Sequence, residues 1–333
     1  MRQRYRLALL ALTALVLAPG TFVRTIPPPP DYASPVTVTK LRVKPWQTGL
    51  LTLESAWQLA SKNDYFGGYS ALVDRGDGTF LSASDAGRMM VLPRPDQSDV
   101  APRLDTLLQI AASEKRRTDV ESLAIDPQTG TVWAGLEQRD AIIRFSPKLR
   151  EERRVRPPEM RPWEANAGAE SLVRLKDGRF IVIAEETHGE GRHEALLFGE
   201  DPTLGKRPIA FTFIAAEGWR PSDATLLPDG RILVIMRKLL FQWPPKFEVK
   251  LAIADPAGIR PGGALQSTTI AHIAEPLPSD NFEGATVTIE PNGDWAIWLI
   301  SDDNFFRLQR TLLLKLIWPQ SRHDAAYDKR RPE

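Results

Sequence analysis

The sequence predicts an all-β protein of the β-propeller class, with five blades favoured. From Val36 onward, short strand-like runs alternate with Gly, Pro and Asp turns, and no long run has helical periodicity. One hairpin pattern recurs five times at intervals of about fifty residues, which is typical of four-stranded propeller blades. The chain has 333 residues, of which 42% are hydrophobic, enough for one large β domain.

The N-terminal segment, residues 1–20, predicts a signal peptide or an N-terminal anchor. Three arginines within the first six residues precede an apolar run from Leu7 to Ala18. That run is shorter than the ~20 residues that span a bilayer. A proline-rich linker follows at 21–35. We expect a periplasmic or secreted bacterial protein, held at a membrane only if this segment stays uncleaved.

The propeller is expected at 36–318, followed by a disordered polar tail at 319–333. The third repeat shows the four strands of a blade most plainly, at Glu170–Leu175, Arg179–Glu186, Glu194–Phe198 and Pro208–Ile214.

The last repeat supplies only three strands, the final one at Thr311–Trp318. We expect Leu51–Ala60 to add its outer strand, which would close the ring by joining the two chain ends. Val36–Val43 is then left over, either as an added edge strand or as part of a sixth, degenerate blade.

The composition excludes several kinds of site. The absence of cysteine excludes disulfides, thiolate zinc sites, iron–sulfur clusters and cysteine nucleophiles. The net charge is +1, and no basic run is interleaved with aromatics, so we expect no nucleic-acid partner. No Gly-x-Ser-x-Gly, Walker, Gly-x-Gly-x-x-Gly or His-Glu-x-x-His motif is present, and we expect no organic cofactor.

The repeated hairpins place acidic residues at equivalent positions. The superposed hairpins start at Ser70, Glu121, Glu170, Asp223 and Glu283, and the ends of their second strands carry Asp85, Glu137, Glu185, Arg237 and Asp302. In an antiparallel hairpin the first and last residues are neighbours. Because the first strand of each blade lines the central channel, we expect all these side chains around one mouth of that channel.

A ring of carboxylates with little counter-charge is electrostatically expensive. Oxygen ligands without Cys or clustered His favour Ca²⁺, with Mg²⁺ as the alternative. The predicted metal ligands are Glu121, Glu170, Glu283, Asp302 and Asp303. The structural alternative is that these acids cap strand ends and bond to backbone amides, linking one blade to the next.

The predicted catalytic residues are Glu170, Glu185, Glu283 and Asp302, with His188 as an acid–base candidate in the loop after Glu185. A plain loop histidine is the alternative for His188. Arg237 breaks the acidic pattern and is either a built-in counter-ion or an anion binder. The other predicted substrate-binding residues are Lys238, Arg88 and Asp223; for the neighbouring basic residues the alternative is a solvated surface charge.

Several motifs carry a family resemblance. The most specific are Asn281-Phe-Glu-Gly284 and Ser301-Asp-Asp-Asn-Phe305, supported by Phe66-Gly-Gly-Tyr-Ser-Ala-Leu72 ahead of Ser84-Asp85, Asn166-Ala-Gly-Ala-Glu-Ser-Leu172, the stretch Pro221 to Gly230, and Gln309-Arg-Thr-Leu-Leu313. From about residue 50 to 318 the chain resembles the phytase-like family, described as "esterase-like activity of phytase" proteins. It departs from the family's common Ser-Asp-Arg-Gly at Ser84-Asp85-Ala86-Gly87, although Arg88 follows closely.

The resemblance implies an exported propeller that hydrolyses phosphate esters and depends on Ca²⁺. Our leading hypothesis is a metal-dependent phosphoesterase or esterase of the cell envelope, monomeric, acting on a small anionic ester. A second hypothesis is a non-catalytic propeller that binds a ligand or a partner protein in the envelope. A third is a lactonase-like sugar-ester hydrolase resembling the gluconolactonase propellers, which hold a divalent ion with Glu, Asn and Asp.

Overall fold

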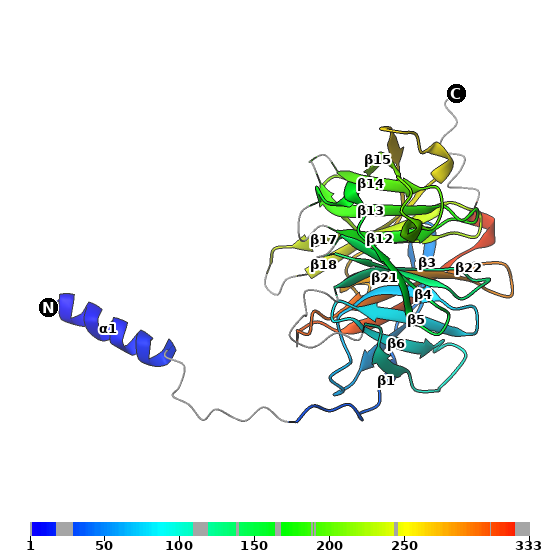
Figure 1. The fold of residues 1–333 in the computed structure, drawn as a ribbon. Helices are drawn as coiled ribbons and strands as arrows, with labels where there is room; N and C mark the ends of the chain where they lie inside the picture. Colours follow the sequence, from blue (N-terminus) through cyan, green and yellow to red (C-terminus); the bar gives the residue numbers. More distant parts are fainter. Residues whose placement is uncertain are drawn as a thin grey trace.

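The computed structural model describes residues 2–17, 29–108, 119–137, 140–163, 168–187, 189, 191–242, 246–306 and 308–323. Within these residues the strands form five sheets, and each sheet is one blade of a β-propeller (Figure 1). The predicted five-bladed fold is confirmed. The residues described form no sixth blade.

Blades 1 and 2 each contain four strands in chain order, with the first strand innermost. Blade 1 consists of β4 (Tyr69–Asp74), β5 (Thr79–Ser84), β6 (Arg88–Pro93) and β7 (Arg103–Thr106). Blade 2 consists of β8 (Val120–Ile125), β9 (Val132–Leu136), β10 (Ala141–Phe145) and β11 (Glu151–Val155).

Blades 3 and 4 also have four strands in chain order, and one short strand from the segment of blade 4 joins the sheet of blade 3. Blade 3 consists of β12 (Ala169–Arg174), β13 (Phe180–Thr187), β14 (Arg192–Phe198) and β15 (Ile209–Ile214), close to the predicted strands. Blade 4 consists of β16 (Arg220–Leu226), β17 (Ile232–Leu240), β18 (Lys246–Ala254) and β20 (Thr268–Ile273). Between the last two of these, β19 (Ala264–Gln266) leaves blade 4 and pairs in parallel with β15 at the edge of blade 3.

Blade 5 joins the two ends of the chain, as predicted. Its inner strands are β21 (Asn281–Ile289), β22 (Trp295–Asp302) and β23 (Thr311–Trp318), and β3 (Leu51–Ala60) pairs antiparallel with β23. The leftover segment forms the added edge strand β1 (Thr37–Lys40), and β2 (Trp46–Thr48) pairs with the start of β3.

An ion-pair network supports this closure. The Lys315 ammonium on β23 lies 3.0 Å from a carboxylate oxygen of Glu54 on β3, and 2.9 Å from one of Asp96 in blade 1. The buried side chain of Lys315 thus connects the closing strand to the next blade.

The hydrophobic core consists of wedges between blades, and none of them fills the ring's centre. Each of the five main buried clusters draws its residues from two neighbouring blades. Trp298, fully buried between blades 5 and 1, packs on Trp57 of β3 and on Phe80 of β5. Each innermost strand also contacts the innermost strands of both neighbours, so these strands enclose the channel.

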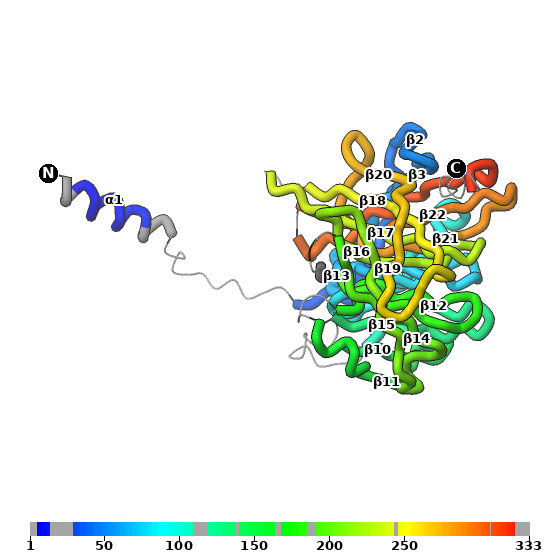
Figure 2. The backbone as a smooth tube through the Cα atoms, turned by 90° about the horizontal axis from the view of Figure 1, so that it is seen from above, coloured from blue at the N-terminus to red at the C-terminus, as the bar shows by residue number. Residues whose placement is uncertain are grey.

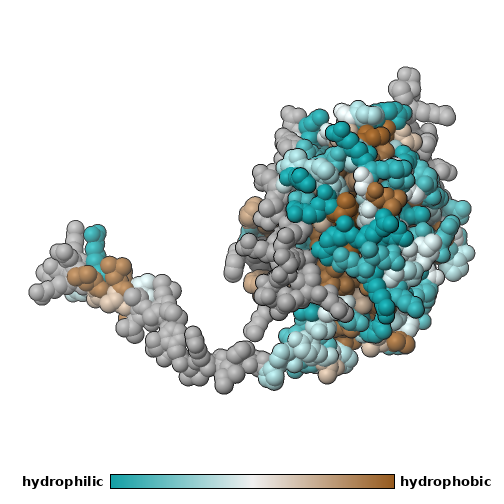
Figure 3. Space-filling model, in the orientation of Figure 1, coloured by the Kyte–Doolittle hydropathy of each residue, from teal (hydrophilic) through white to brown (hydrophobic). Residues whose placement is uncertain are grey.

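The remaining elements are short. The helix α1 (Arg2–Leu17) lies outside the propeller (Figures 1 and 2), and hydrophobic side chains are exposed along it (Figure 3). Among the described helices, none is long and apolar enough to cross a membrane. Three-residue 3-10 helices occur at η2 (Pro158–Met160), η3 (Pro202–Leu204), η4 (Pro256–Gly258) and η5 (Gln320–Arg322).

The described chain continues beyond the predicted domain end at Trp318. After η5, His323 stacks on Trp295 with ring centroids 3.7 Å apart. The described residues therefore end at 323, and the rest of the expected tail, 324–333, lies outside them.

Candidate functional site

Every innermost hairpin carries a β-bulge at the same position. In each blade the pairing between the first two strands skips one residue of the inner strand, and the skipped residues are Ser70, Glu121, Glu170, Ser222 and Glu283. A bulge bends the strand and redirects the side chain of the extra residue. The five repeats therefore present these side chains at one end of the channel.

The ends of the second strands are also equivalent, as predicted. In each hairpin, one residue of the second strand pairs with the inner-strand residue that precedes the bulge. The next residue of the second strand is Asp85, Glu137, Glu185, Arg237 or Asp302. These side chains stand beside the bulge residues. We call Asp119, Glu121, Glu137, Glu170, Glu185, Glu283 and Asp302 the acidic arc.

The superposition predicted from the sequence was wrong by one residue in blade 4. The bulge residue there is Ser222, and Asp223 takes the position that Ser122 holds in blade 2. Asp223 is buried and accepts hydrogen bonds from the amides of Ala224 (2.7 Å) and Ala285 (2.8 Å). Since Ala285 belongs to β21, Asp223 links blade 4 to blade 5. Its role in substrate binding remains a prediction.

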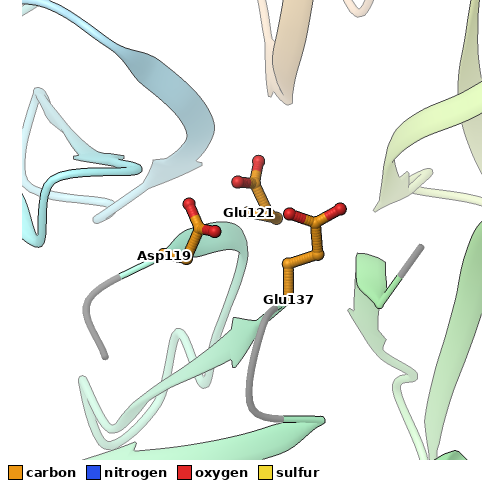
Figure 4. A group of neighbouring side chains, drawn as sticks. All are labelled: Asp119, Glu121 and Glu137. Atoms are coloured by element: carbon orange, nitrogen blue, oxygen red, sulfur yellow. The ribbon is translucent and has the colours of Figure 1, made fainter. Parts of the chain in front are cut away.

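Two carboxylate triads share Glu137. In the first, Asp119, Glu121 and Glu137 each offer one oxygen within 4.8 Å of the others, and Figure 4 shows the three carboxyl groups converging. In the second, the same holds for Glu137, Glu170 and Glu185. A Cβ atom on Gly168 would lie 2.6 Å from the Glu137 Cα, so only glycine there lets blades 2 and 3 approach this closely.

Glu170 is the most deeply buried of the triad residues. The residue is only 3% exposed. Burial and the neighbouring Glu185 raise the pKa of Glu170 above its usual range, although Arg237 acts in the opposite direction. Burial and Glu170 likewise raise the pKa of Glu121.

Burial and carboxylates of both triads raise the pKa of Glu137. Burial, together with the charges of Asp119 and Glu185, raises the pKa of Glu137 to about 8. Asp119 and Glu137 also share a side-chain hydrogen bond. The metal-free site therefore holds protons near neutral pH, because too many carboxylates share one enclosed space.

Arg237 is the counter-ion of the acidic arc. One terminal nitrogen donates to Glu185 at 2.9 Å, and the other donates to Asn281 at 3.0 Å and to Glu283. Asn281 in turn donates to Glu283 at 2.7 Å. Burial lowers the pKa of Arg237, but the adjacent carboxylates outweigh it and hold that pKa above its ordinary value.

Asp302 and Asp303 differ in their surroundings. Burial and the charge of Glu283 raise the pKa of Asp302, whose Oδ1 accepts a 2.7 Å hydrogen bond from the Asn304 amide. Asp303 accepts hydrogen bonds from the amides of Gly68 and Phe305 and from the Thr311 hydroxyl. Asp303 therefore holds the loop after β22 against blade 1, and neither residue joins a triad.

The predicted basic residues do not gather beside Arg237. Lys238 is exposed, and its ammonium lies 6.0 Å from the centre of the Trp219 ring. Successive residues of a strand point to opposite faces, which explains why Lys238 and Arg237 diverge. The Arg88 guanidinium stacks 4.2 Å above the ring of Tyr65. His188 lies outside the described residues, so its acid–base role stays a prediction.

Asp119 and Glu137 were not assigned a role from the sequence. Asp119 precedes β8 in a position with no acidic counterpart in the other four repeats, where Gly68, Gly168, Arg220 and Asn281 stand. Asp119 and Glu121 are two residues apart, and residues two apart in a strand point to the same face. This spacing could have identified Asp119 from the sequence.

Comparisons with known proteins give one family. A family model described as "Phytase-like: Esterase-like activity of phytase" matches residues 64–305. No curated protein matches the sequence. Similar solved structures include a gluconolactonase from Xanthomonas campestris, with 13% identity over 84% of this chain and 97% of that one, and a TM-score of 0.45. A luciferin-regenerating enzyme has 13% identity over 84% and 95%, with a TM-score of 0.43.

Proposed function

The chain belongs to the phytase-like family, and we propose that it is a divalent-cation-dependent hydrolase of ester bonds. The observation that carries the proposal is the pair of carboxylate triads sharing Glu137. Like charges enclosed together either take up protons or bind a cation. Glu170, only 3% exposed, shares its triad with two further carboxylates, and a buried acid usually has a partner.

The triad residues fit a hard cation. Ca²⁺ and Mg²⁺ prefer carboxylate oxygens, and the proposed ligands are Asp119, Glu121, Glu137, Glu170 and Glu185. This set keeps Glu121 and Glu170 from the sequence prediction. It leaves out Glu283, Asp302 and Asp303, which belong to neither triad.

A cation bound there would act as a Lewis acid on an ester oxygen. In hydrolysis the oxygen of water bonds to the acyl carbon, the ester C–O bond breaks, the alcohol leaves with a proton from an acid, and the proton that the water loses restores that acid. Asp302 is the proposed proton donor, because burial and Glu283 raise its pKa and one of its oxygens accepts from Asn304. Arg237 and Asn281 fix the orientation of Glu283 beside it.

The charge balance favours a carboxylic ester over a phosphate ester. Arg237 is engaged by Glu185, Asn281 and Glu283, and the Lys238 and Arg88 side chains are directed at aromatic rings. Apart from Arg220, which lies 3.7 Å from Glu185, the acidic arc therefore has few cations left among the described residues for a multiply charged phosphate. A phosphate ester remains the second candidate because the family description refers to phytase.

The experiment uses the purified protein, treated with EDTA and then given Ca²⁺ or Mg²⁺. We expect cation-dependent cleavage of p-nitrophenyl acetate and slower cleavage of p-nitrophenyl phosphate. Glu170→Gln should lose both cation binding and cleavage, whereas Glu151→Gln, on the exposed edge strand β11, should retain both. A wild-type protein that binds neither cation and cleaves neither ester would overturn the proposal and favour the non-catalytic binding propeller.

We also propose that the protein works in the bacterial cell envelope. The support is the N-terminal order of arginines, apolar run and proline-rich stretch. Fractionation of cells that express the full chain tests this: activity and protein should appear outside the cytoplasm, and deletion of residues 1–28 should retain them inside.

A further inference from the structure

A groove of about 1260 Å³ is lined by residues of blades 4 and 5 and of the segments next to their strands. Its lining is mainly apolar and includes Trp46 of β2, Leu239 of β17, Ala274 after β20, and Phe306 and Leu308 after β22. Small-molecule sites usually measure about 300–1,000 Å³. The groove can therefore hold an extended apolar group.

The groove exposes apolar side chains that the core does not use. Phe306 is 54% exposed, Leu308 64% and Trp46 49%. Scattered apolar residues on a surface need no explanation, but a concave apolar surface indicates a binding site.

One lining residue of the groove, Asp280, lies three residues before Glu283 of the acidic arc in the sequence. Asp280 lines the groove, and the next residue, Asn281, bonds to both Glu283 and Arg237. Arg310, also in the lining, donates its backbone amide to Asp280 at 3.3 Å. Asp280 and Arg310 thus form a wall of the groove next to the start of β21, the strand that carries Glu283.

We propose that this groove binds the apolar part of the substrate, so that the enzyme prefers esters with a long acyl chain over compact, hydrophilic ones. The proposal rests on the hydrolase function proposed above. Each methylene buried in the groove would strengthen binding, and the burial of apolar surface predicts an increase of about 2- to 4-fold per methylene. The acidic arc, in contrast, would contact only the polar ester group.

The test is a series of p-nitrophenyl esters from acetate to decanoate. For the wild-type protein, kcat/KM should rise with chain length until the groove is filled. Ala274→Phe, which fills the groove, should lower the ratio of decanoate to acetate cleavage at least 10-fold. Phe306→Ser removes an exposed wall without touching the core and should lower the same ratio about 3-fold. Phe241→Ser changes a 95% exposed phenylalanine outside the lining and should leave the ratio unchanged.

A binding measurement separates this inference from the proposed function. Octanamide, a non-hydrolysable analogue, should bind the wild-type protein by calorimetry and bind Ala274→Phe at least 10-fold more weakly. Octanamide binding without cleavage of any ester would overturn the hydrolase but support the groove. Ester cleavage at equal rates for all chain lengths, or octanamide binding that both groove variants retain, would overturn the groove inference while the hydrolase stands.

Discussion

The Arg237 guanidinium donates a hydrogen bond of 2.9 Å to Glu185 across the boundary between blades 4 and 3. The same side chain also holds Glu283 of blade 5. One cation therefore joins three blades at the mouth of the channel, and it separates the two triads from the carboxylates of blade 5.

Replacing Arg237 with methionine should destabilise the metal-free protein by about 3 kcal/mol at pH 7.5. Removing one partner of a buried ion pair leaves the other charges uncompensated. The loss should shrink at pH 5, because burial raises the pKa of Glu283, which can then take up a proton. Urea unfolding at the two pH values checks this. Arg154→Met, in an exposed pair with Glu151, should cost less than about 0.5 kcal/mol, and an equal Arg237→Met loss at both pH values would contradict the prediction.

The stability of the metal-free protein should fall as the pH rises from about 5 to about 8. The pKa of Glu137 is about 8 in the folded protein and about 4.3 in an unfolded chain. Between these values the folded state binds more protons, so the free energy of unfolding decreases by at most about 1.4 kcal/mol per pH unit for each such group. Glu121 and Glu170 act in the same direction.

Unfolding in EDTA across this pH range measures the slope. Glu137→Gln should flatten it, whereas Glu151→Gln should leave it unchanged. Ca²⁺ must displace these protons to bind, so its affinity should increase with pH over the same interval. Stability that rises between pH 5 and 8 without metal would show that the triads are ionised in the folded state.

Gly284→Ala should destabilise the propeller by about 1–3 kcal/mol. A Cβ atom at this position would lie 2.8 Å from the carbonyl carbon of Ala71 and 2.9 Å from the Leu72 nitrogen, both in blade 1. Backbone atoms cannot move aside as a side chain can, so blades 5 and 1 would have to separate. Gly199→Ala, where no atom lies within 4 Å, is the matched control, and equal melting temperatures for the two variants would refute this account.

Deleting residues 1–60 should prevent cooperative folding, because it removes β3 and leaves β23 as an unpaired edge. Deleting residues 1–28 removes no strand and should leave the unfolding transition unchanged. Circular dichroism and size-exclusion chromatography distinguish the outcomes. A monomeric, cooperatively unfolding 61–333 fragment would mean that the ring does not need this closure.

The repeat made the fold predictable from the sequence, and the local backbone limited what could be predicted of the site. The turn glycines set the blade boundaries, and the short last repeat required the strand at Leu51–Ala60. The equivalence of Glu137, Glu185 and Arg237 followed from their common distance to those glycines. The position of a bulge cannot be recognised in the sequence in the way that a turn glycine can. In blade 4, Ser222 and Asp223 are both polar, and either could have been the bulge residue.

The interactions between blades could not be predicted either. The approach of Glu137 to Glu170 depends on how blades 2 and 3 pack, and the sequence shows this only afterwards, in Gly168. Lys238 and Arg237 lie apart because successive side chains of a strand point to opposite faces. The groove is formed by four segments that are distant in the sequence.

The pairing of β3 with β23 also limits the order in which the protein can fold. Ser55 pairs with Lys315. The strand β3, one of the first to be synthesised, therefore cannot pair until β23, near the end of the chain, has been synthesised. Closing so long a loop costs entropy before any contact repays it, which predicts slow folding. Until then the alternating apolar residues of β3, with Leu51, Leu53 and Leu59 buried only in the finished ring, form an unpaired edge that can associate with other chains. Synthesis and storage of incomplete chains should therefore require a chaperone that covers this strand.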